Sequence, residues 1–269
     1  MANATSVHLA VVQMSMSTDL QTNIDVATGH IRAAHAAGAH IILVPELFEY
    51  HYFPQYEKEE LFRLAHEVEN HPFITHFAEL AKELHVVLPI SFFEKANHAY
   101  FNSLVMINAD GTVMGVYRKS HIPDGPGYEE KYYFNPGDTG FKTWRTAYGN
   151  IGVGICWDQW YPEAARIMAL YGADLLLYPT AIGTEPPETG GYDTGPLWHR
   201  VMVGHAVANL VYVAAANRVG TEGETTFYGT SFISYYSGEF LEQMDQTEEG
   251  FIMAELDYEP ARDFRAGFG

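Results

Sequence analysis

The chain has 269 residues, of which 47% are hydrophobic and 18% charged, a composition typical of a globular protein with a sizeable core. Asp and Glu number 34 against 15 Lys and Arg, which gives a formal net charge of −19. Such an acidic protein is a poor partner for nucleic acid and favours cationic ligands. The chain has one cysteine, no apolar run long enough to span a membrane and no secretory segment at its start, so we expect a cytoplasmic protein without a membrane partner.

Short apolar runs and helix-like segments alternate along the chain, separated by Gly, Pro and Asp-Gly turn residues. The first part of the chain predicts a strand at 8–14, a helix at 23–37, a strand at 39–46, a helix at 72–85, a strand at 86–93 and a hairpin of 104–109 with 112–117. The second part predicts a strand at 151–155, a helix at 162–171, a strand at 174–179, a helix at 197–209 and a strand at 211–217. A hairpin of 230–234 with 239–244 and a strand at 248–256 follow. Long irregular segments at 120–140 and 184–193 interrupt this order, and loops of that length are often functional.

The sequence contains an internal repeat. The segments Gly38-Ala-His-Ile-Ile-Leu-Val-Pro45 and Gly172-Ala-Asp-Leu-Leu-Leu-Tyr-Pro179 match residue by residue in character, and each follows a predicted strand and helix. We interpret them as parts of two related β-α-β halves of a single domain that spans 1–269. Strands that alternate with helices, together with added hairpins, predict an α/β fold in which two mixed sheets stack face to face with helices outside.

Three polar side chains share one predicted position, the C-terminal end of a strand. Glu46 ends the strand at 39–46, Lys119 follows the first hairpin, and Cys156 follows the strand at 151–155 as the chain turns towards a helix. Ligands bind at this edge of open α/β sheets. Each residue alone has a structural explanation, and a lone cysteine is most often an inert core residue. Together they indicate chemistry, since a carboxylate takes a thiol proton and a lysine lowers a thiol pKa and stabilises an oxyanion.

The segments around these residues resemble the nitrilase (carbon–nitrogen hydrolase) superfamily. The matching pieces are Pro45-Glu46-Leu-Phe, Tyr117-Arg-Lys119-Ser-His121 and Gly154-Ile-Cys156-Trp-Asp-Gln-Trp-Tyr-Pro162-Glu163, in the family's order. The likeness runs from near residue 7 to the end of the chain. It implies a four-layer α-β-β-α sandwich of two mixed sheets, in agreement with the predicted layers, and assembly into a homodimer or a higher homo-oligomer.

The resemblance also implies a reaction. Cys156 matches the nucleophile, Glu46 the general base, and Lys119 the cation that stabilises the oxyanion. The thiolate would attack an unreactive carbonyl such as that of a ureido group, and ammonia would leave with a proton from Glu46. Water would then hydrolyse the carbamoyl thioester to carbon dioxide and a free amine. This chemistry requires no metal and no organic cofactor.

Four further positions follow from the same match. Glu130 corresponds to a second glutamate beside the lysine that helps to position substrate, and the adjacent Glu129 is the alternative. The backbone N–H of Trp157 is the implied second oxyanion donor. We expect His121 to be a structural or supporting residue.

The residues after the nucleophile bear on the substrate. Relatives that hydrolyse N-carbamoyl-D-amino acids bind the substrate carboxylate with two arginines shortly after the cysteine, whereas this chain has Gln159 and Trp160 there. A substrate carboxylate would therefore lack its bidentate partner. We expect a small-molecule N-carbamoyl compound whose far end is an amine, although another N-carbamoyl amine or 3-ureidopropionate remains the alternative.

Carboxylates in the neighbouring loops suit such a cationic end. Asp158, Asp124 and Glu185 are the candidates, and Glu185 is the first choice for the amine contact. Each is also explained as a solvated surface charge. Tyr52 or Trp198 is expected to flank the methylene chain of the substrate.

Three other classes of function fit the sequence less well. The 13 histidines include no His-Glu-x-x-His motif, which disfavours a metal hydrolase. A glycosidase with Glu46 and Glu130 as its two carboxylates would leave Lys119 and Cys156 without roles. A binding or assembly module of the same fold would be expected to lack one of these four residues, and here all four are present.

Overall fold

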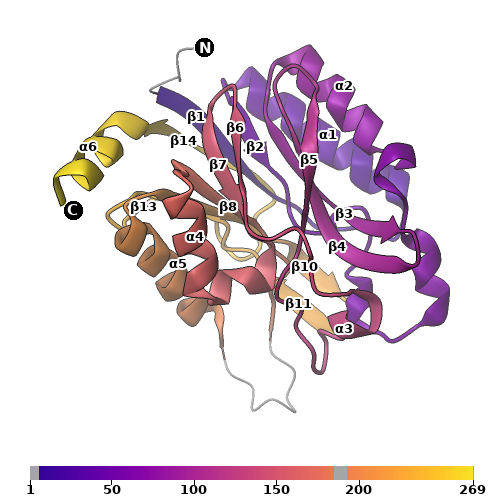
Figure 1. The fold of residues 1–269 in the computed structure, drawn as a ribbon. Helices are drawn as coiled ribbons and strands as arrows, with labels where there is room; N and C mark the ends of the chain where they lie inside the picture. Colours follow the sequence, from indigo (N-terminus) through magenta and orange to yellow (C-terminus); the bar gives the residue numbers. More distant parts are fainter. Residues whose placement is uncertain (1–5, 185–192, 269) are drawn as a thin grey trace.

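The computed structural model describes residues 6–184 and 193–268. Two mixed β-sheets stack face to face, and helices cover both outer faces (Figure 1). The helices α1 and α2 lie on one side of the molecule, and α4 and α5 lie on the other. The α/β sandwich predicted from the sequence is therefore confirmed.

The first sheet is built mainly by the first half of the chain. The elements are β1 (Ser6–Gln13), α1 (Leu20–Ala36), β2 (Ile41–Leu43), α2 (Ile74–Leu84), β3 (Leu88–Ala96), β4 (Ala99–Ile107), β5 (Val113–Arg118) and, from the end of the chain, β14 (Gly250–Asp257). β1 pairs parallel with β2 and antiparallel with β14, while β3, β4 and β5 form an antiparallel meander. Backbone hydrogen bonds between the β2 segment and Val87, which precedes β3, join the two groups of strands.

The second sheet follows from residue 143 onward. Its elements are β6 (Thr143–Thr146), β7 (Gly149–Val153), α4 (Pro162–Leu170), β8 (Leu175–Pro179), α5 (Gly195–Asn209), β9 (Tyr212–Ala216), β12 (Phe232–Ser234) and β13 (Phe240–Gln243). The strand order is β13-β12-β9-β8-β7-β6, with β7, β8 and β9 parallel. The unit β7-α4-β8 therefore repeats the β1-α1-β2 unit, as the internal repeat predicted.

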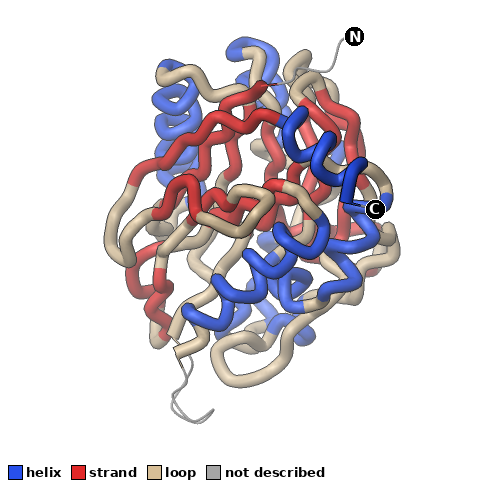
Figure 2. The backbone as a smooth tube through the Cα atoms, turned by 90° about the vertical axis from the view of Figure 1, so that its left-hand side faces the viewer, coloured by secondary structure: helices blue, strands red, loops and turns tan. Residues whose placement is uncertain are grey.

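Several short elements were not predicted. They are the hairpin of β10 (Val219–Glu222) and β11 (Thr225–Tyr228), the short helix α3 (Glu130–Tyr133), the helix α6 (Tyr258–Phe268), and the 3-10 helices at Phe53–Gln55, Glu59–Leu64, Val68–Asn70 and Cys156–Trp160. α3 and the 3-10 helices are too short to show a clear apolar period in the sequence. In Figure 1, α6 (yellow) lies at the left-hand edge of the molecule, and in Figure 2 this C-terminal helix lies on the face turned toward the viewer, where it continues from β14.

The central strands β1, β2, β7, β8 and β9 are buried on both faces, which explains their largely apolar sequences. In β1, Leu9 and Val11 pack between the two sheets, whereas Ala10 and Val12 pack under α1 and α2. A third apolar cluster lies between the second sheet and the helices α4 and α5. In the described part of the chain, no helix is long and apolar enough to cross a membrane.

A glycine in the long segment 120–140 allows the loop to pass close to the end of β5. A Cβ added at Gly137 would lie 2.0 Å from the carbonyl oxygen of Arg118 and 2.8 Å from that of Lys119. The backbone N–H of Gly137 donates a hydrogen bond to the Lys119 carbonyl over 2.8 Å. This close approach fixes the loop against the strand end that carries Lys119.

Gly137→Ala should therefore destabilise the fold, because the added methyl collides with backbone atoms that cannot rotate away. We expect a loss of about 1–3 kcal/mol in the free energy of unfolding, measured by urea denaturation. Gly29→Ala is the matched control, since no atom lies within 4 Å of its added Cβ in α1. That control should be neutral or stabilising by about 0.5–1 kcal/mol. Equal stability of the two variants would contradict the packing described.

Candidate active site

Cys156 occupies a strained turn between β7 and α4. It begins the 3-10 helix Cys156–Trp160 with φ of 40°, a left-handed conformation that is unfavourable for a residue with a side chain. Its thiol is almost completely buried and lies 3.8 Å from the carbonyl oxygen of Ala181. The strand-turn-helix geometry predicted around this cysteine is confirmed.

Asp158 supports this turn from within. Its carboxylate accepts hydrogen bonds from the backbone N–H of Ile155 over 2.9 Å and from the hydroxyl of Tyr117 over 2.7 Å. It also accepts from the backbone N–H of His121 over 3.0 Å, and the His121 ring nitrogen lies 2.8 Å away. The carboxylate thus ties the cysteine turn to the segment that follows Lys119.

The expectation that Asp158 contacts the substrate amine is therefore wrong. Both of its oxygens are occupied by internal donors and the side chain is fully buried. His121, by contrast, has the supporting position expected for it. Its ring stacks on Tyr161 with 3.6 Å between the ring centroids.

The ammonium of Lys119 lies between two carboxylates. Its Nζ is 2.8 Å from Oε1 of Glu46, and 2.9 and 2.7 Å from the two oxygens of Glu130. All three side chains are fully buried. Glu130 begins α3, whereas Glu129 lies just outside that helix and is partly exposed, so the structure places Glu130 and not Glu129 beside the lysine.

Each carboxylate has a second donor that sequence reasoning did not identify. The side-chain amide of Asn102 donates to Oε1 of Glu46 over 2.7 Å, and the hydroxyl of Tyr52 donates to Oε1 of Glu130 over 2.6 Å. In the described residues, Oε2 of Glu46 has no hydrogen-bond partner. A buried acceptor without a donor is suited to receive a proton.

The structure gives Tyr52 a contact beyond the one expected for it. Its side chain is fully buried, and its ring packs edge-on against Tyr128, with 5.9 Å between the ring centroids. Its hydroxyl donates to Glu130, so Tyr52 contacts a candidate catalytic group, and its expected contact with the substrate chain stays a prediction. Nothing in the sequence marks Asn102 on β4 as a site residue, because the alternation of side chains along a strand predicts only which face of the sheet each one lies on.

The lysine stays charged in this environment. Burial disfavours the ammonium, but the negative charges of Glu130 and Glu46 outweigh burial and raise the pKa of Lys119 above its ordinary value. Burial also raises the pKa of Glu130, although Lys119 acts in the opposite direction. The site therefore retains a fixed cation next to two carboxylates.

The thiol is neutral in the resting site. Burial and the charge of Glu46 raise the pKa of Cys156 well above its ordinary value, and Lys119 offsets only part of this effect. Lys119 lowers the thiol pKa as expected, but burial and the charge of Glu46 outweigh this effect. Attack by the sulfur must be accompanied by transfer of its proton to a nearby base.

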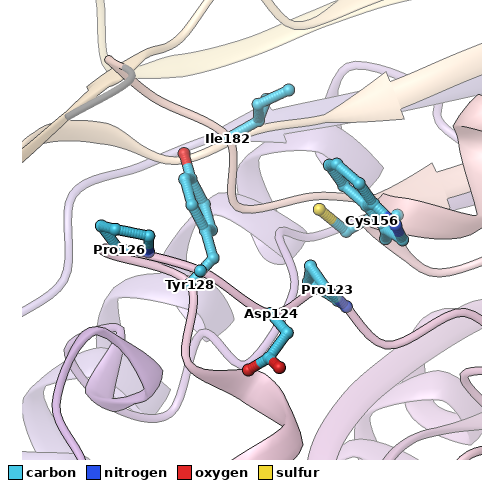
Figure 3. A pocket seen from close by; sticks show the side chains of 8 residues that line it. Pro123, Asp124, Pro126, Tyr128, Cys156 and Ile182 are labelled. Atoms are coloured by element: carbon cyan, nitrogen blue, oxygen red, sulfur yellow. The ribbon is translucent and has the colours of Figure 1, made fainter. Parts of the chain in front are cut away.

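A pocket gives access to the cysteine. It encloses about 590 Å³ of empty space, including its open mouth, and is lined by Pro123, Asp124, Gly125, Pro126, Tyr128, Cys156, Trp157 and Ile182. In Figure 3 the sulfur of Cys156 points into the space beside Tyr128 and Pro123, and the carboxylate of Asp124 points away from the sulfur. The structure therefore places Asp124 and Trp157 on the pocket wall, and their contacts with the substrate stay predictions.

Comparison with known proteins identifies the family. Residues 8–266 match the family model for carbon–nitrogen hydrolases. The chain is 53% identical to the N-carbamoylputrescine amidase of Solanum lycopersicum, over 98% of this chain and 90% of that protein. It is 48% identical to a citrullinase of Francisella tularensis, over 94% of this chain and 90% of that protein. The chain belongs to the carbon–nitrogen hydrolase family.

Solved structures agree with this assignment of the carbon–nitrogen hydrolase fold. A carbon–nitrogen hydrolase from Helicobacter pylori has a TM-score of 0.91 and 38% sequence identity, over 98% of this chain and 93% of that chain. The yeast protein Nit3, described as a member of the nitrilase superfamily, has a TM-score of 0.83 and 27% identity, over 97% of this chain and 94% of that chain. The resemblance inferred from the sequence is confirmed.

Two further expectations for this carbon–nitrogen hydrolase concern substrate contacts. Trp198 on α5 is fully buried beneath the second sheet, and its indole N–H donates to Gln159 over 2.7 Å. It is not among the described residues that line the pocket, so the structure gives its expected contact with the substrate chain no support. Glu185 lies outside the described residues. Among those residues, no group of three or more His, Cys, Asp or Glu is placed to hold a metal ion.

The raised thiol pKa predicts how this carbon–nitrogen hydrolase reacts with iodoacetamide, which alkylates the thiolate. An ordinary cysteine has a pKa of about 8.5, so its alkylation rate levels off just above that pH. Because burial and Glu46 shift the Cys156 pKa upward, its alkylation rate should still be rising above about pH 9. The rate is measured by mass spectrometry of the intact protein at a series of pH values.

Cys156→Ala is the control for this measurement, since it removes the only cysteine of the chain and should abolish labelling. The same variant should lose turnover while keeping the fold, because a methyl group fits where the small thiol packed. An alkylation rate that levels off below about pH 8 would show a low-pKa thiolate and contradict the electrostatics described.

Proposed function

We propose that this carbon–nitrogen hydrolase cleaves the ureido group of N-carbamoylputrescine and releases putrescine, carbon dioxide and ammonia. The observation that carries the proposal is the buried Lys119, held by Glu46 and Glu130 next to the single cysteine. The assignment to this substrate is supported by relatives named N-carbamoylputrescine amidase, which include the Arabidopsis thaliana protein at 52% identity over 96% of this chain.

The first half of the reaction breaks the bond to ammonia. As the sulfur of Cys156 attacks the ureido carbon, its proton passes to Oε2 of Glu46, the buried oxygen without a hydrogen-bond partner in the described residues. The carbonyl oxygen becomes an oxyanion, which Lys119 and the backbone N–H of Trp157 stabilise. The protonated Glu46 then donates to the departing nitrogen, so ammonia leaves and a carbamoyl thioester remains on the sulfur.

The second half consumes water. Glu46 removes a proton from a water molecule that attacks the thioester carbon, and the same two donors stabilise the second oxyanion. The sulfur leaves as a thiol after regaining the proton from Glu46. The released carbamate decomposes into carbon dioxide and the free amine, and no cofactor takes part.

The pocket favours a substrate with a cationic end. Its lining among the described residues includes the carboxylate of Asp124 and no Lys or Arg side chain. Asp124 lies 3.7 Å from Lys131, but both side chains are about half exposed, so this contact is weak. Glu185, which lies outside the described residues, is the second proposed contact for the amine. Trp157 and Tyr128 would provide apolar surface for the methylene chain.

Citrulline is the second candidate substrate, because the chain is 48% identical to a citrullinase. Citrulline shares the ureido group but carries a carboxylate beside its amine. The described lining residues provide no cation for that carboxylate, which favours the simple amine. The same argument disfavours 3-ureidopropionate.

The cellular location and the oligomeric state of the enzyme are also part of the proposal. A single cysteine and the acidic, globular composition fit a cytoplasmic enzyme. The family resemblance supports a homodimer or a higher homo-oligomer. Exposed apolar side chains on or beside the outer helices α4 and α5, including Leu170, Tyr171 and Val207, are compatible with subunit contacts.

Direct comparison of substrates tests the proposal. N-carbamoylputrescine should be hydrolysed with a kcat/KM at least about a hundredfold above those of 3-ureidopropionate and citrulline, because only the amine avoids an unpaired carboxylate in the pocket. Ammonia release measures all three reactions at equal enzyme concentration. Equal or better use of either carboxylate-bearing compound would contradict the substrate assignment and leave the catalytic residues unaffected.

Glu185→Gln and Asp124→Asn extend this test to the proposed amine contacts. Loss of one charge-assisted contact should raise KM for N-carbamoylputrescine by roughly ten- to a hundredfold, with a smaller change in kcat. Glu163→Gln is the matched control, since Glu163 is an exposed carboxylate in the first turn of α4 and does not line the pocket. If Glu185→Gln and Asp124→Asn both behave like the control, neither carboxylate binds the amine.

A further inference from the structure

A buried ion pair lies behind the catalytic carboxylates, and no step of the proposed reaction uses it. Arg218 immediately precedes β10 and Glu222 ends that strand. The guanidinium Nη1 lies 3.0 Å from each oxygen of the Glu222 carboxylate, and both side chains are almost completely buried. Removing two charges from water is unfavourable unless other groups satisfy their remaining hydrogen bonds. The contacts of this pair therefore indicate what it does.

The guanidinium binds the backbone of the turn that carries Glu46. Its Nε and Nη2 donate to the carbonyl oxygen of Glu46 over 3.2 and 2.9 Å, and Nη2 also donates to that of Leu47 over 2.5 Å. Nη1 donates to the carbonyl oxygen of Tyr50 over 2.9 Å. Leu47 has a φ of 46°, so the turn adopts an unfavourable conformation that these contacts hold in place.

The carboxylate of the pair reaches the other catalytic glutamate. Oε2 of Glu222 accepts a hydrogen bond from the backbone N–H of Tyr52 over 2.5 Å. The hydroxyl of that tyrosine donates to Oε1 of Glu130 over 2.6 Å. Arg218 is thus connected to Glu46 through the backbone carbonyl group of Glu46, and Glu222 is connected to Glu130 through Tyr52.

We propose that Arg218 and Glu222 are positioning residues that set the places of Glu46 and Glu130 on either side of Lys119. Neither residue touches the substrate. The proposal rests on the proposed function insofar as Glu46 is the base for Cys156. A planar guanidinium with five N–H donors can bind three carbonyl groups and a carboxylate at once, whereas a lysine ammonium cannot reproduce this geometry.

Arg218→Lys and Glu222→Asp test the proposal, because each keeps its charge and moves the hydrogen-bonding atoms. Misplacement of a catalytic group by about 1 Å lowers a rate by about a hundredfold, so we expect kcat for N-carbamoylputrescine to fall by about ten- to a hundredfold. KM should stay within about threefold, because the pair does not contact the substrate. Circular dichroism and the thermal midpoint give the folded fraction to which kcat is normalised.

Arg262→Lys is the matched control. Arg262 on α6 also forms a partly buried ion pair, with its Nη2 2.7 Å from Oδ2 of Asp174, and neither residue lines the active-site pocket. The same chemical change there should leave kcat within about twofold of the wild-type value, as expected for a substitution outside the catalytic group.

A second readout does not depend on the substrate. Glu46 raises the pKa of Cys156, so a displaced Glu46 should shift the pH profile of iodoacetamide alkylation to lower pH in Arg218→Lys. The Arg262→Lys profile should coincide with that of the wild type. If the wild-type enzyme hydrolysed no ureido compound, the proposed function would fail, and the alkylation profiles would still decide whether the pair positions Glu46.

The proposal is overturned if Arg218→Lys and Glu222→Asp keep wild-type kcat per folded molecule. It is also overturned if Arg218→Lys lowers kcat but keeps the wild-type alkylation profile, since Glu46 then still lies beside the thiol. If neither variant folds, the pair serves the fold alone and the positioning role is wrong. A reduced kcat together with a shifted profile supports it.

Discussion

The active site depends on one buried ammonium between two carboxylates. The Lys119 ammonium forms ion pairs with both Glu46 and Glu130. Without its charge, two buried anions would repel each other next to the thiol. Burial, together with the charge of Glu46, raises the pKa of Cys156 well above its ordinary value and keeps the thiol protonated at rest. Reactivity then depends on proton transfer to Glu46 at the moment of attack and not on a preformed thiolate. Such a site protects the thiol from other electrophiles until a carbonyl is in place.

The sandwich brings this group together from both sheets. Glu46 and Lys119 follow β2 and β5 of the first sheet, whereas Cys156 follows β7 of the second. The backbone turns sharply after two of these strands, with positive φ at Leu47 and Cys156. Internal hydrogen bonds hold both turns. The Arg218 guanidinium binds the turn at Leu47, and the Asp158 carboxylate binds the turn at Cys156. Rigid strands thus set the coarse positions, and buried polar contacts set the fine ones.

Much of this arrangement could be predicted because it depends on local sequence. Apolar runs that end on Glu46 or just before Cys156 indicate strand ends, and the repeated β-α-β pattern indicates two stacked sheets with helices outside. The direction of a side chain within a short turn is not readable in this way, which is why Asp158 was expected to face the substrate although it is buried in the turn. Arg218 gave no signal, because its partner Glu46 is 172 residues away and the contact is made through a backbone carbonyl.

The central claim is that Cys156 forms a covalent bond to the ureido carbon during turnover. Rapid acid quenching of the enzyme with excess N-carbamoylputrescine, followed by mass spectrometry of the peptide that contains Cys156, tests it most directly. The account predicts an adduct on that cysteine with the mass of the substrate less ammonia, which disappears once the substrate is exhausted. Turnover without any adduct on Cys156, or with an adduct on another residue alone, would contradict it.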